Sequence, residues 1–310
     1  MIAFFEDGFY RPRLVHYVIR TFLLPFSWLY CFVAIVDKLL CRRSCQSLPV
    51  VSVGNLVVGG SGKTPVIKEL AKRYENVAVV LRGYGRKSRG LVQVSKKGEI
   101  LIDVEQSGDE AMELALALKD ACVYVSEDRK EAIERAKKDG ARVVFLDDGF
   151  RHCIAKFDIL LKKPTPNRSC LPAGPYRLPP YFEKLADVVL EEGNHFTKEV
   201  HILHPTEKMV LLTSIADPAR LDPYLPPDIP RYAFEDHHFF TQKELDSIWR
   251  KERPTSFLVT RKDLVKLEKF DFRYSILDLR IHMKPKIVER IDHYIRNFDA
   301  KKDTDCPDAT

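Results

Sequence analysis

The chain has 310 residues, of which 45% are hydrophobic and 30% charged, and its formal net charge at pH 7 is +6. This length and composition are enough for two ordinary domains with buried cores, and they exclude a chain that is disordered throughout. The positive charge is compatible with anionic partners, but the sequence contains no module that reads nucleic-acid bases, so we expect no nucleic acid among them.

The segment before residue 45 is apolar and flanked by basic residues. The stretch from Thr21 to Val36 carries no formal charge, with Arg20 before it and Lys38 after it. It is shorter than the roughly 20 residues that a helix needs to cross a bilayer, and no small-residue cleavage site follows it as in a signal peptide. Two interpretations remain open, a helix packed on the protein's own core and a helix lying in the membrane interface. Aromatic residues and flanking arginines occur together, which favours the membrane-associated helix.

Residues 49–64 predict a buried strand, a glycine-rich turn and the start of a helix. The turn reads Gly59-Gly60-Ser61-Gly62-Lys63-Thr64. Its glycines let successive backbone N–H groups point toward an anion, and the helix adds the positive end of its dipole. We expect Lys63 to reach the outer phosphates of ATP and the Thr64 hydroxyl to bind the accompanying Mg²⁺. The strict pattern of a phosphate loop has glycine at the position of Val57, so a turn that only closes a strand–helix unit is the alternative.

From residue 49 to about 190, short apolar runs alternate with amphipathic segments. The expected strands are 50–53, 77–81, 122–125, 143–146, 159–161 and 188–190, and the expected helices are 64–74, 108–119 and 127–138. Continuous apolar strands that alternate with helices predict an α/β fold of the P-loop NTPase type, a mostly parallel sheet with helices on both faces. Ligands then bind at the carboxyl ends of the strands.

A basic stretch lies within this region. Between Arg82 and Lys97 the chain carries several basic residues and no acidic one. The two interpretations are a solvated loop and a docking site for an anionic phosphate or an anionic membrane.

Three groups of polar residues fall near predicted strand ends. Asp147 and Asp148 follow a buried strand, at the place where P-loop enzymes hold Mg²⁺ or its water shell. Asp109 opens a helix just after Ser107, so a helix cap is the alternative role for either residue. A proline-rich turn presents Arg177, either as a structural residue or as a phosphate contact.

After His204 the strand and helix patterns resume and predict a second, smaller α/β domain. The predicted organisation is an N-terminal membrane-associated helix (1–45), a P-loop kinase core (46–204), the smaller domain (205–300) and a tail (301–310). Within the smaller domain, His237 and His238 stand among acidic and aromatic residues. Two adjacent histidines are too few for a metal site, and a buried structural histidine is the alternative to a functional one.

The chain has seven cysteines and no C-x-x-C pair. An odd number argues against a disulfide framework and fits a reducing cytosol. Cys41 and Cys45 have no second pair that would complete a zinc site.

Several segments resemble motifs of the tetraacyldisaccharide 4'-kinases, ATP-dependent enzymes that phosphorylate the lipid A precursor at the cytosolic face of the Gram-negative inner membrane. The segments are residues 52–64, 82–86, 108–110, 126–129, 147–150, 171–174 and 236–237. Their order and spacing, over nearly the whole chain, carry the resemblance. The family's phosphate loop also lacks glycine at the position of Val57.

The resemblance implies roles for individual residues. Lys63 and Thr64 match the nucleotide and Mg²⁺ contacts. Asp109 matches the base that deprotonates the sugar hydroxyl, and His237 matches its catalytic partner across a cleft between the domains. The residues expected on the metal side are Thr64, Glu110, Asp147 and Asp148, and those expected to bind the substrate are Arg82, Tyr84, Arg86, Arg129 and Arg177.

Three positions depart from the family pattern. Arg151 stands where glutamine is usual, Leu178 where glutamate is usual, and Arg261 where glutamate is common. A carboxylate missing at position 178 removes one expected ligand from the metal side.

The implied function is ATP- and Mg²⁺-dependent phosphorylation of the 4'-hydroxyl of tetraacyldisaccharide 1-phosphate in lipid A biosynthesis. The implied partners are this lipid precursor and the inner-membrane surface, with the protein peripheral at the cytoplasmic face; no protein partner is indicated. Two alternatives are a P-loop kinase of a soluble metabolite and a membrane-recruited nucleotide switch. The guanine-reading pattern [NT]-K-x-D is not met at residues 260–263, because Lys262 falls one place late.

Overall fold

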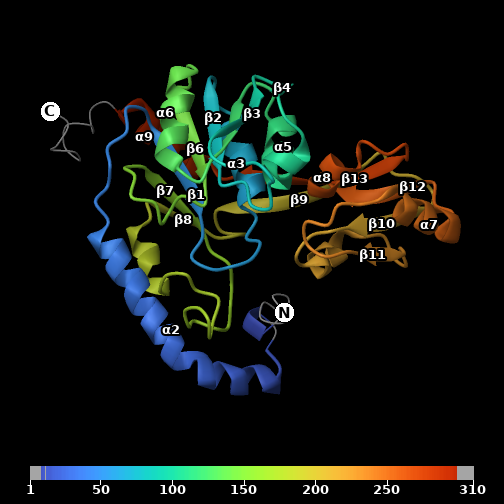
Figure 1. Cartoon of the computed structure of the whole chain (residues 1–310), viewed down its shortest axis with the longest axis horizontal. Helices are drawn as coiled ribbons and strands as arrows, with labels where there is room; N and C mark the ends of the chain where they lie inside the picture. The colour runs from blue at the N-terminus through green and yellow to red at the C-terminus, as the bar shows by residue number, and fades with distance from the viewer. Residues whose placement is uncertain (1–7, 11, 299–310) are drawn as a thin grey trace. The chain divides into compact units, whose positions relative to one another are not determined.

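The computed structural model describes residues 8–10 and 12–298 (Figure 1). The predicted tail, 301–310, lies outside the described residues. The structure divides into two compact units, each made of separate stretches of chain. The first takes the chain up to Ile67, from Lys137 to Thr197 and from Met283 onward, and the second takes Lys68–Ala136 and Lys198–His282. The domain boundaries drawn from the sequence, near residues 46 and 205, stay predictions.

Parallel strands dominate the first unit. Its strands are β1 (Val50–Gly54), β6 (Val143–Asp147), β7 (Phe157–Leu161) and β8 (Val188–Leu190), in the order β6-β1-β7-β8 and all parallel. Every residue of β1, β6 and β7 is buried, as the continuous apolar runs predict. Its helices are α2 (Leu14–Leu40) and α9 (Pro285–Arg296), together with the start of α3 (Lys63–Ala71) and the 3₁₀ turn Pro180–Leu185.

The second unit contains two groups of strands. The first group, in the order β4-β3-β5-β2, comprises β2 (Val77–Leu81), β3 (Val92–Lys96), β4 (Glu99–Ile100) and β5 (Cys122–Val125); β2 and β5 are parallel, and β3 is antiparallel to its neighbours. The second is a five-stranded sheet, in the order β11-β10-β12-β13-β9, of β9 (Phe196–Leu203), β10 (Met209–Thr213), β11 (Arg231–Ala233), β12 (Ser256–Thr260) and β13 (Tyr274–Met283). The mostly parallel α/β class predicted from the sequence is confirmed.

The remaining helices are α4 (Val104–Ser107), α5 (Asp109–Ala117), α6 (Arg129–Lys138), α7 (Gln242–Glu252) and α8 (Arg261–Leu267), with a 3₁₀ turn at Pro218–Tyr224. Around the five-stranded sheet the core is aromatic: the buried Phe257 ring lies 5.1 Å from that of Trp249 and 5.4 Å from that of Phe272. This packing holds α7 against the sheet, and α8 follows directly from β12.

Helix α2 is longer than the uncharged stretch that predicted it. It runs for 27 residues and continues through Pro25, so the length argument against crossing a bilayer was wrong for the whole helix. Within residues 8–298 it is the one helix that length and composition alone would allow to cross a membrane.

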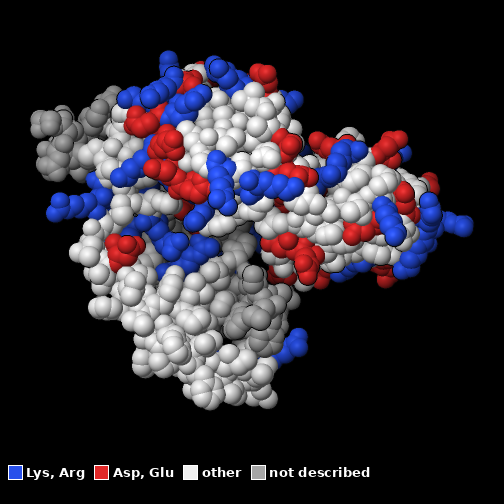
Figure 2. Space-filling view, viewed as in Figure 1, with Lys and Arg blue, Asp and Glu red and all other residues white. Residues whose placement is uncertain are grey.

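One face of α2 packs on the first unit and the other does not. Tyr30, Cys31, Ala34 and Ile35 contact a buried cluster that includes Phe150, and the buried Ser27 hydroxyl donates to the carbonyl of Cys170. The large exposed side chains of the opposite face are Leu14, Val15, Tyr17, Val18, Phe22, Phe26, Trp28, Leu29, Phe32, Val33, Leu39 and Leu40. Figure 2 shows the surface along α2 as largely white, with few charged residues. The helix therefore packs on the core, as one interpretation predicted, and it also presents an apolar face; the membrane-associated interpretation stays a prediction.

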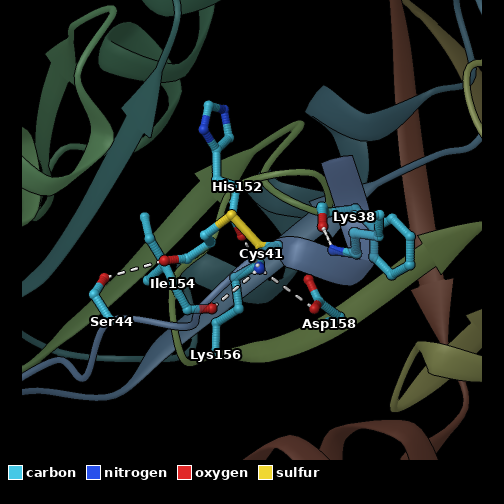
Figure 3. Close-up of a disulfide and its surroundings, with 9 residues drawn as sticks. Lys38, Cys41, Ser44, His152, Ile154, Lys156 and Asp158 are labelled. Carbon is cyan, nitrogen blue, oxygen red and sulfur yellow. Dashed lines mark hydrogen bonds and ion pairs between the residues drawn. A yellow bond between two sulfur atoms is a disulfide. The ribbon is translucent and has the colours of Figure 1, made fainter. Parts of the chain in front are cut away.

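Disulfides and one lysine fasten α2 to the segments that follow β6 and β7. Cys41 bonds to Cys153 (Figure 3). Cys31 bonds to Cys170. The expectation of no disulfides was wrong for these four residues, because partners 112 and 139 positions apart leave no local spacing signature. Beside the Cys41 bond, Lys38 Nζ donates to the carbonyl of Phe150 at 2.5 Å.

Candidate active site

The glycine-rich turn forms the loop expected between β1 and α3. Gly59 and Gly62 have φ angles of 85° and 81°, a region that favours glycine, and α3 begins at Lys63. Val57 departs from the strict phosphate-loop pattern for a reason visible in the structure: it is buried and forms an antiparallel bridge with Tyr176. A side chain at this position fills the core rather than the loop.

The loop lysine faces a carboxylate from the neighbouring parallel strand. Lys63 Nζ lies 4.0 Å from Oδ1 of Asp148, which follows β6, and Arg177 Nη1 lies 2.6 Å from Oδ2. Burial acts to raise the pKa of Asp148, but the charges of Lys63 and Arg177 outweigh it and hold that pKa below its usual value. Asp148 also has a φ of 54°, a strained conformation for a non-glycine residue and one common at functional sites.

Arg177 reaches Asp148 because its turn is bound to the loop. The N–H of Val58 donates to the carbonyl of Pro175 at 2.9 Å, and the N–H of Arg177 donates to that of Leu56 at 2.7 Å. The Arg177 side chain thus forms an ion pair with Asp148, and its contact with the substrate stays a prediction. The next residue, Leu178, is buried in the same core cluster as Leu56. Position 178 therefore carries no side chain that could bind a metal ion.

The residues expected to hold Mg²⁺ are oxygen donors, which suits this ion. The described part of the chain has no group of three or more His, Cys, Asp or Glu side chains that could hold a metal ion by themselves. Mg²⁺ in kinases is characteristically bound by one or two carboxylates together with substrate phosphates, so Asp147, Asp148 and Thr64 fit an ion that arrives with ATP. Glu110, also expected on the metal side, lies 3.9 Å from Lys262 Nζ.

In the second unit, the structure brings Asp109 and His237 together although 128 positions separate them. Nδ1 of His237 lies 3.1 Å from Oδ2 of Asp109, whose side chain is 3% exposed. Asp109 is the first residue of α5, whose N-cap is Gly108 and has no side-chain cap bond, so the helix-cap role is not the one observed. The aspartate is thus held by a histidine and not by its own helix.

The charges around this pair shift both pKa values toward the ionised forms. Burial raises the pKa of Asp109, but the hydrogen bonds and charges of His237 and Lys266 more than offset it, and the net pKa is lowered. The hydrogen bond to Asp109 is the main cause that raises the pKa of His237. His237 has a φ of 64°, and its N–H donates to the carbonyl of Ser214 at 3.2 Å. A strained residue whose side chain meets a buried carboxylate is typical of a functional site.

Lys266 is the residue of this group that sequence reasoning missed. Its Nζ lies 3.1 Å from Oδ2 of Asp109 and its side chain is fully buried. The available signal was its spacing of three residues from Asp263, which places an acid and a base on one helical face.

The residues assigned to the substrate divide into two groups. Arg82 and Tyr84 are exposed, with the Arg82 guanidinium 5.3 Å from the Tyr84 ring centre. Arg86 instead forms a 2.7 Å ion pair with Glu127, and the buried Arg129 donates to the carbonyl of Ser126. Arg86 and Arg129 therefore hold their own loops, and the contact of Arg82 and Tyr84 with a substrate stays a prediction.

A phosphate loop between a buried parallel strand and a helix, with its lysine facing a carboxylate of the adjacent strand, defines the P-loop class of nucleotide-binding proteins. The comparisons narrow this class. The sequence model of the LpxK family, described as tetraacyldisaccharide-1-P 4'-kinase, matches residues 19–221 and 204–296. The chain belongs to this family.

Relatives named tetraacyldisaccharide 4'-kinase match nearly the full length. One from Helicobacter pylori (strain HPAG1) is 44% identical over 298 residues, 95% of this chain and 96% of its own. One from Aliarcobacter butzleri is 43% identical over 309 residues, 94% of this chain and 97% of its own. A crystal structure described as the apo form of LpxK from Aquifex aeolicus in complex with ATP has a TM-score of 0.73 and 28% identity, covering 89% of this chain and 99% of that one.

The phosphate loop generates a first prediction. We expect Lys63→Ala and Thr64→Ala each to lower the rate of phosphoryl transfer by about 10²-fold or more, because both groups stabilise charge in the transition state. Steady-state turnover with saturating ATP is the measurement. Lys72→Ala, an exposed lysine just after α3, is the matched control, and near-normal turnover in both loop variants would remove the phosphate-loop assignment.

The contact between Asp109 and His237 generates a second prediction. Residues that act as a unit lose function non-additively, so Asp109→Asn and His237→Ala should each slow turnover by about 10²-fold or more with little change in ATP affinity. The double variant should be little slower than the worse single one. His238→Ala is the control, since that neighbouring ring lies 3.2 Å from Glu244 instead. Losses that multiply fully, or a silent His237→Ala, would contradict the pairing.

Proposed function

We propose that the protein transfers the γ-phosphoryl group of ATP to the 4'-hydroxyl of tetraacyldisaccharide 1-phosphate, a step of lipid A biosynthesis. The observation that carries the proposal is 44% identity over 95% of the chain to a relative named tetraacyldisaccharide 4'-kinase. The geometry supports it, because the first unit has a phosphate loop with its lysine in place and the second has a buried aspartate paired with histidine.

The chemistry assigns one task to each group. A bond forms between the sugar oxygen and the γ-phosphorus while the bond from that phosphorus to the bridging oxygen of ADP breaks, and the hydroxyl proton passes to the carboxylate of Asp109. Backbone N–H groups of the loop and Lys63 hold the phosphates. Asp147, Asp148 and Thr64 would hold Mg²⁺, which would supply further positive charge to the phosphates.

Asp109 suits the role of base through its surroundings. Its positive neighbours keep it ionised and therefore able to accept a proton, and its hydrogen bond to His237 fixes its orientation. The exposed Arg82 and Tyr84 are proposed substrate contacts, since an arginine is suited to an anionic phosphate group.

The same proposal places the exposed face of α2 in the cytoplasmic surface of the inner membrane. The face carries Phe, Trp and Leu side chains, which bind at the boundary between headgroups and acyl chains. A membrane-bound kinase meets an acylated substrate where that substrate is dissolved. Of the two alternatives, a kinase of a soluble metabolite gives this face no function.

Phosphate transfer tests the function directly. Purified protein with radiolabelled ATP and a tetraacyldisaccharide 1-phosphate in mixed micelles should yield a labelled bisphosphorylated lipid, and Lys63→Ala should not. A soluble-metabolite kinase would label no lipid, and a nucleotide switch would bind ATP without forming any phosphorylated product.

The exposed face of α2 is tested by substitution rather than deletion, because the opposite face packs on the core. Phe22→Ser, Phe26→Ser and Phe32→Ser combined should move the protein from the membrane fraction toward the soluble one and raise the KM for the lipid, with the KM for ATP unchanged. Each of these three aromatic side chains, once immersed in the membrane, contributes at most about 1.5–3 kcal/mol to binding. The matched control replaces three exposed charged residues of α6, Lys130, Glu134 and Lys137, by serine. Unchanged membrane partition in the α2 variant would show that this face does not bind lipid.

A further inference from the structure

A buried lysine stands between two buried carboxylates of the second unit. Lys266 Nζ lies 3.1 Å from Oδ2 of Asp109 and 3.7 Å from Oδ1 of Asp263, and its side chain is 0% exposed. Removing an ammonium group from water is costly, so such a group persists only where ion pairs and hydrogen bonds compensate. The position of Lys266 is therefore set by these partners.

Asp263, the second carboxylate beside Lys266, is itself held in place by hydrogen bonds. Its Oδ1 accepts from the N–H and the Oγ of Ser214 at 2.9 and 2.6 Å, and its Oδ2 accepts from the hydroxyl of Thr213 at 2.9 Å. The Ser214 Oγ accepts from Lys266 Nζ at 2.5 Å, and the Ser214 carbonyl accepts from the N–H of His237 at 3.2 Å. A single serine thus links the positions of both residues that contact Asp109.

Both of these residues meet Asp109 at the same oxygen. Nδ1 of His237 and Nζ of Lys266 each lie 3.1 Å from Oδ2. Across the described part of the chain, the ion pairs and hydrogen bonds of this carboxylate all go to Oδ2. An ionised carboxylate has acceptor sites on both oxygens, so one held through Oδ2 presents Oδ1 to a proton donor.

We propose that Lys266 is a positioning residue for phosphoryl transfer: together with His237 it holds Oδ2 of Asp109, so that Oδ1 accepts the proton of the sugar hydroxyl. The inference rests on the proposed role of Asp109 as the base. Lys266 itself acts through Asp109 and makes no contact with the substrate. Asp263 and Ser214 serve to hold the lysine in place.

Turnover of Lys266 variants tests the proposal. Lys266→Met should lower kcat by about 10²-fold, the lower end of what a positioned base contributes, with the KM for ATP unchanged. Lys266→Arg should restore part of the loss, because a guanidinium keeps both the charge and the donor. Lys269→Met, an exposed lysine just beyond α8, is the matched control. Lys266→Gln, which keeps a donor, replaces the methionine variant if the latter does not fold, and its kcat should fall between those of wild type and Asp109→Asn.

A double-mutant cycle separates positioning from a purely structural role. In the Asp109→Asn background, the Lys266 substitution should change kcat by less than about twofold, because the group through which the lysine acts is already lost. The same fold-loss in both backgrounds would overturn the proposal and leave Lys266 as a structural residue.

A crystal structure of Lys266→Met gives a readout that does not depend on activity. The Asp109 carboxylate should rotate, and the distance from Oδ2 to Nδ1 of His237 should exceed about 3.5 Å, beyond a hydrogen bond. An unchanged carboxylate would overturn the proposal. Absence of lipid phosphorylation by the wild-type protein would instead overturn the proposed function, and the variant structure would still decide whether Lys266 orients Asp109.

Discussion

The compensation of buried carboxylates by cations is the interaction on which the candidate site depends. Asp148 in the first unit is held by Lys63 and Arg177, and Asp109 in the second is held by His237 and Lys266. Burial alone acts to raise the pKa of both carboxyl groups, and these partners bring each pKa below its usual value. The same ion pairs therefore keep the carboxylates of Asp109 and Asp148 in the charged form that the proposed reaction requires.

Much of the fold could be predicted from hydrophobic patterning. The buried strands β1, β2, β5, β6 and β7 contain continuous apolar runs. The predicted bounds lie within one residue of the observed ones, except that β7 begins two residues before its predicted run. Strands β3, β4, β9 and β11 were missed, because partly exposed strands of mixed composition lack such a run. Helix α2 was underestimated at both ends, because the absence of charge marks only its most apolar part while the backbone continues through Pro25.

The site residues that belong to a local sequence motif could be predicted. Those defined by contacts with residues distant in the sequence were harder to predict. The phosphate loop and the acidic pair after β6 were found from their spacing, and the pairing of Asp109 with His237 came from family resemblance. The ion pair of Arg177 with Asp148 was not predicted, because nothing in its own turn reveals the bridge between Tyr176 and Val57 that joins this turn to the loop. The spacing of Lys266 from Asp263 does not reveal its contact with the distant Asp109, and the bonds Cys31–Cys170 and Cys41–Cys153 join residues too far apart in the sequence to leave a local signal.

The attachment of α2 to the rest of the first unit has a consequence for the proposed membrane association. Lys38, near the end of the helix, donates to the carbonyl of Phe150, two residues beyond Asp148, and Cys41 is bonded to Cys153 in the same segment. Helix α2 and the segment that follows Asp148 are thereby joined at two points, which lie three residues apart in each segment. With the apolar face of α2 immersed in lipid as proposed, the depth of the helix sets the height of Asp148 above the acyl chains. A change in the depth of the helix would therefore move Asp148 by a similar distance relative to the membrane surface.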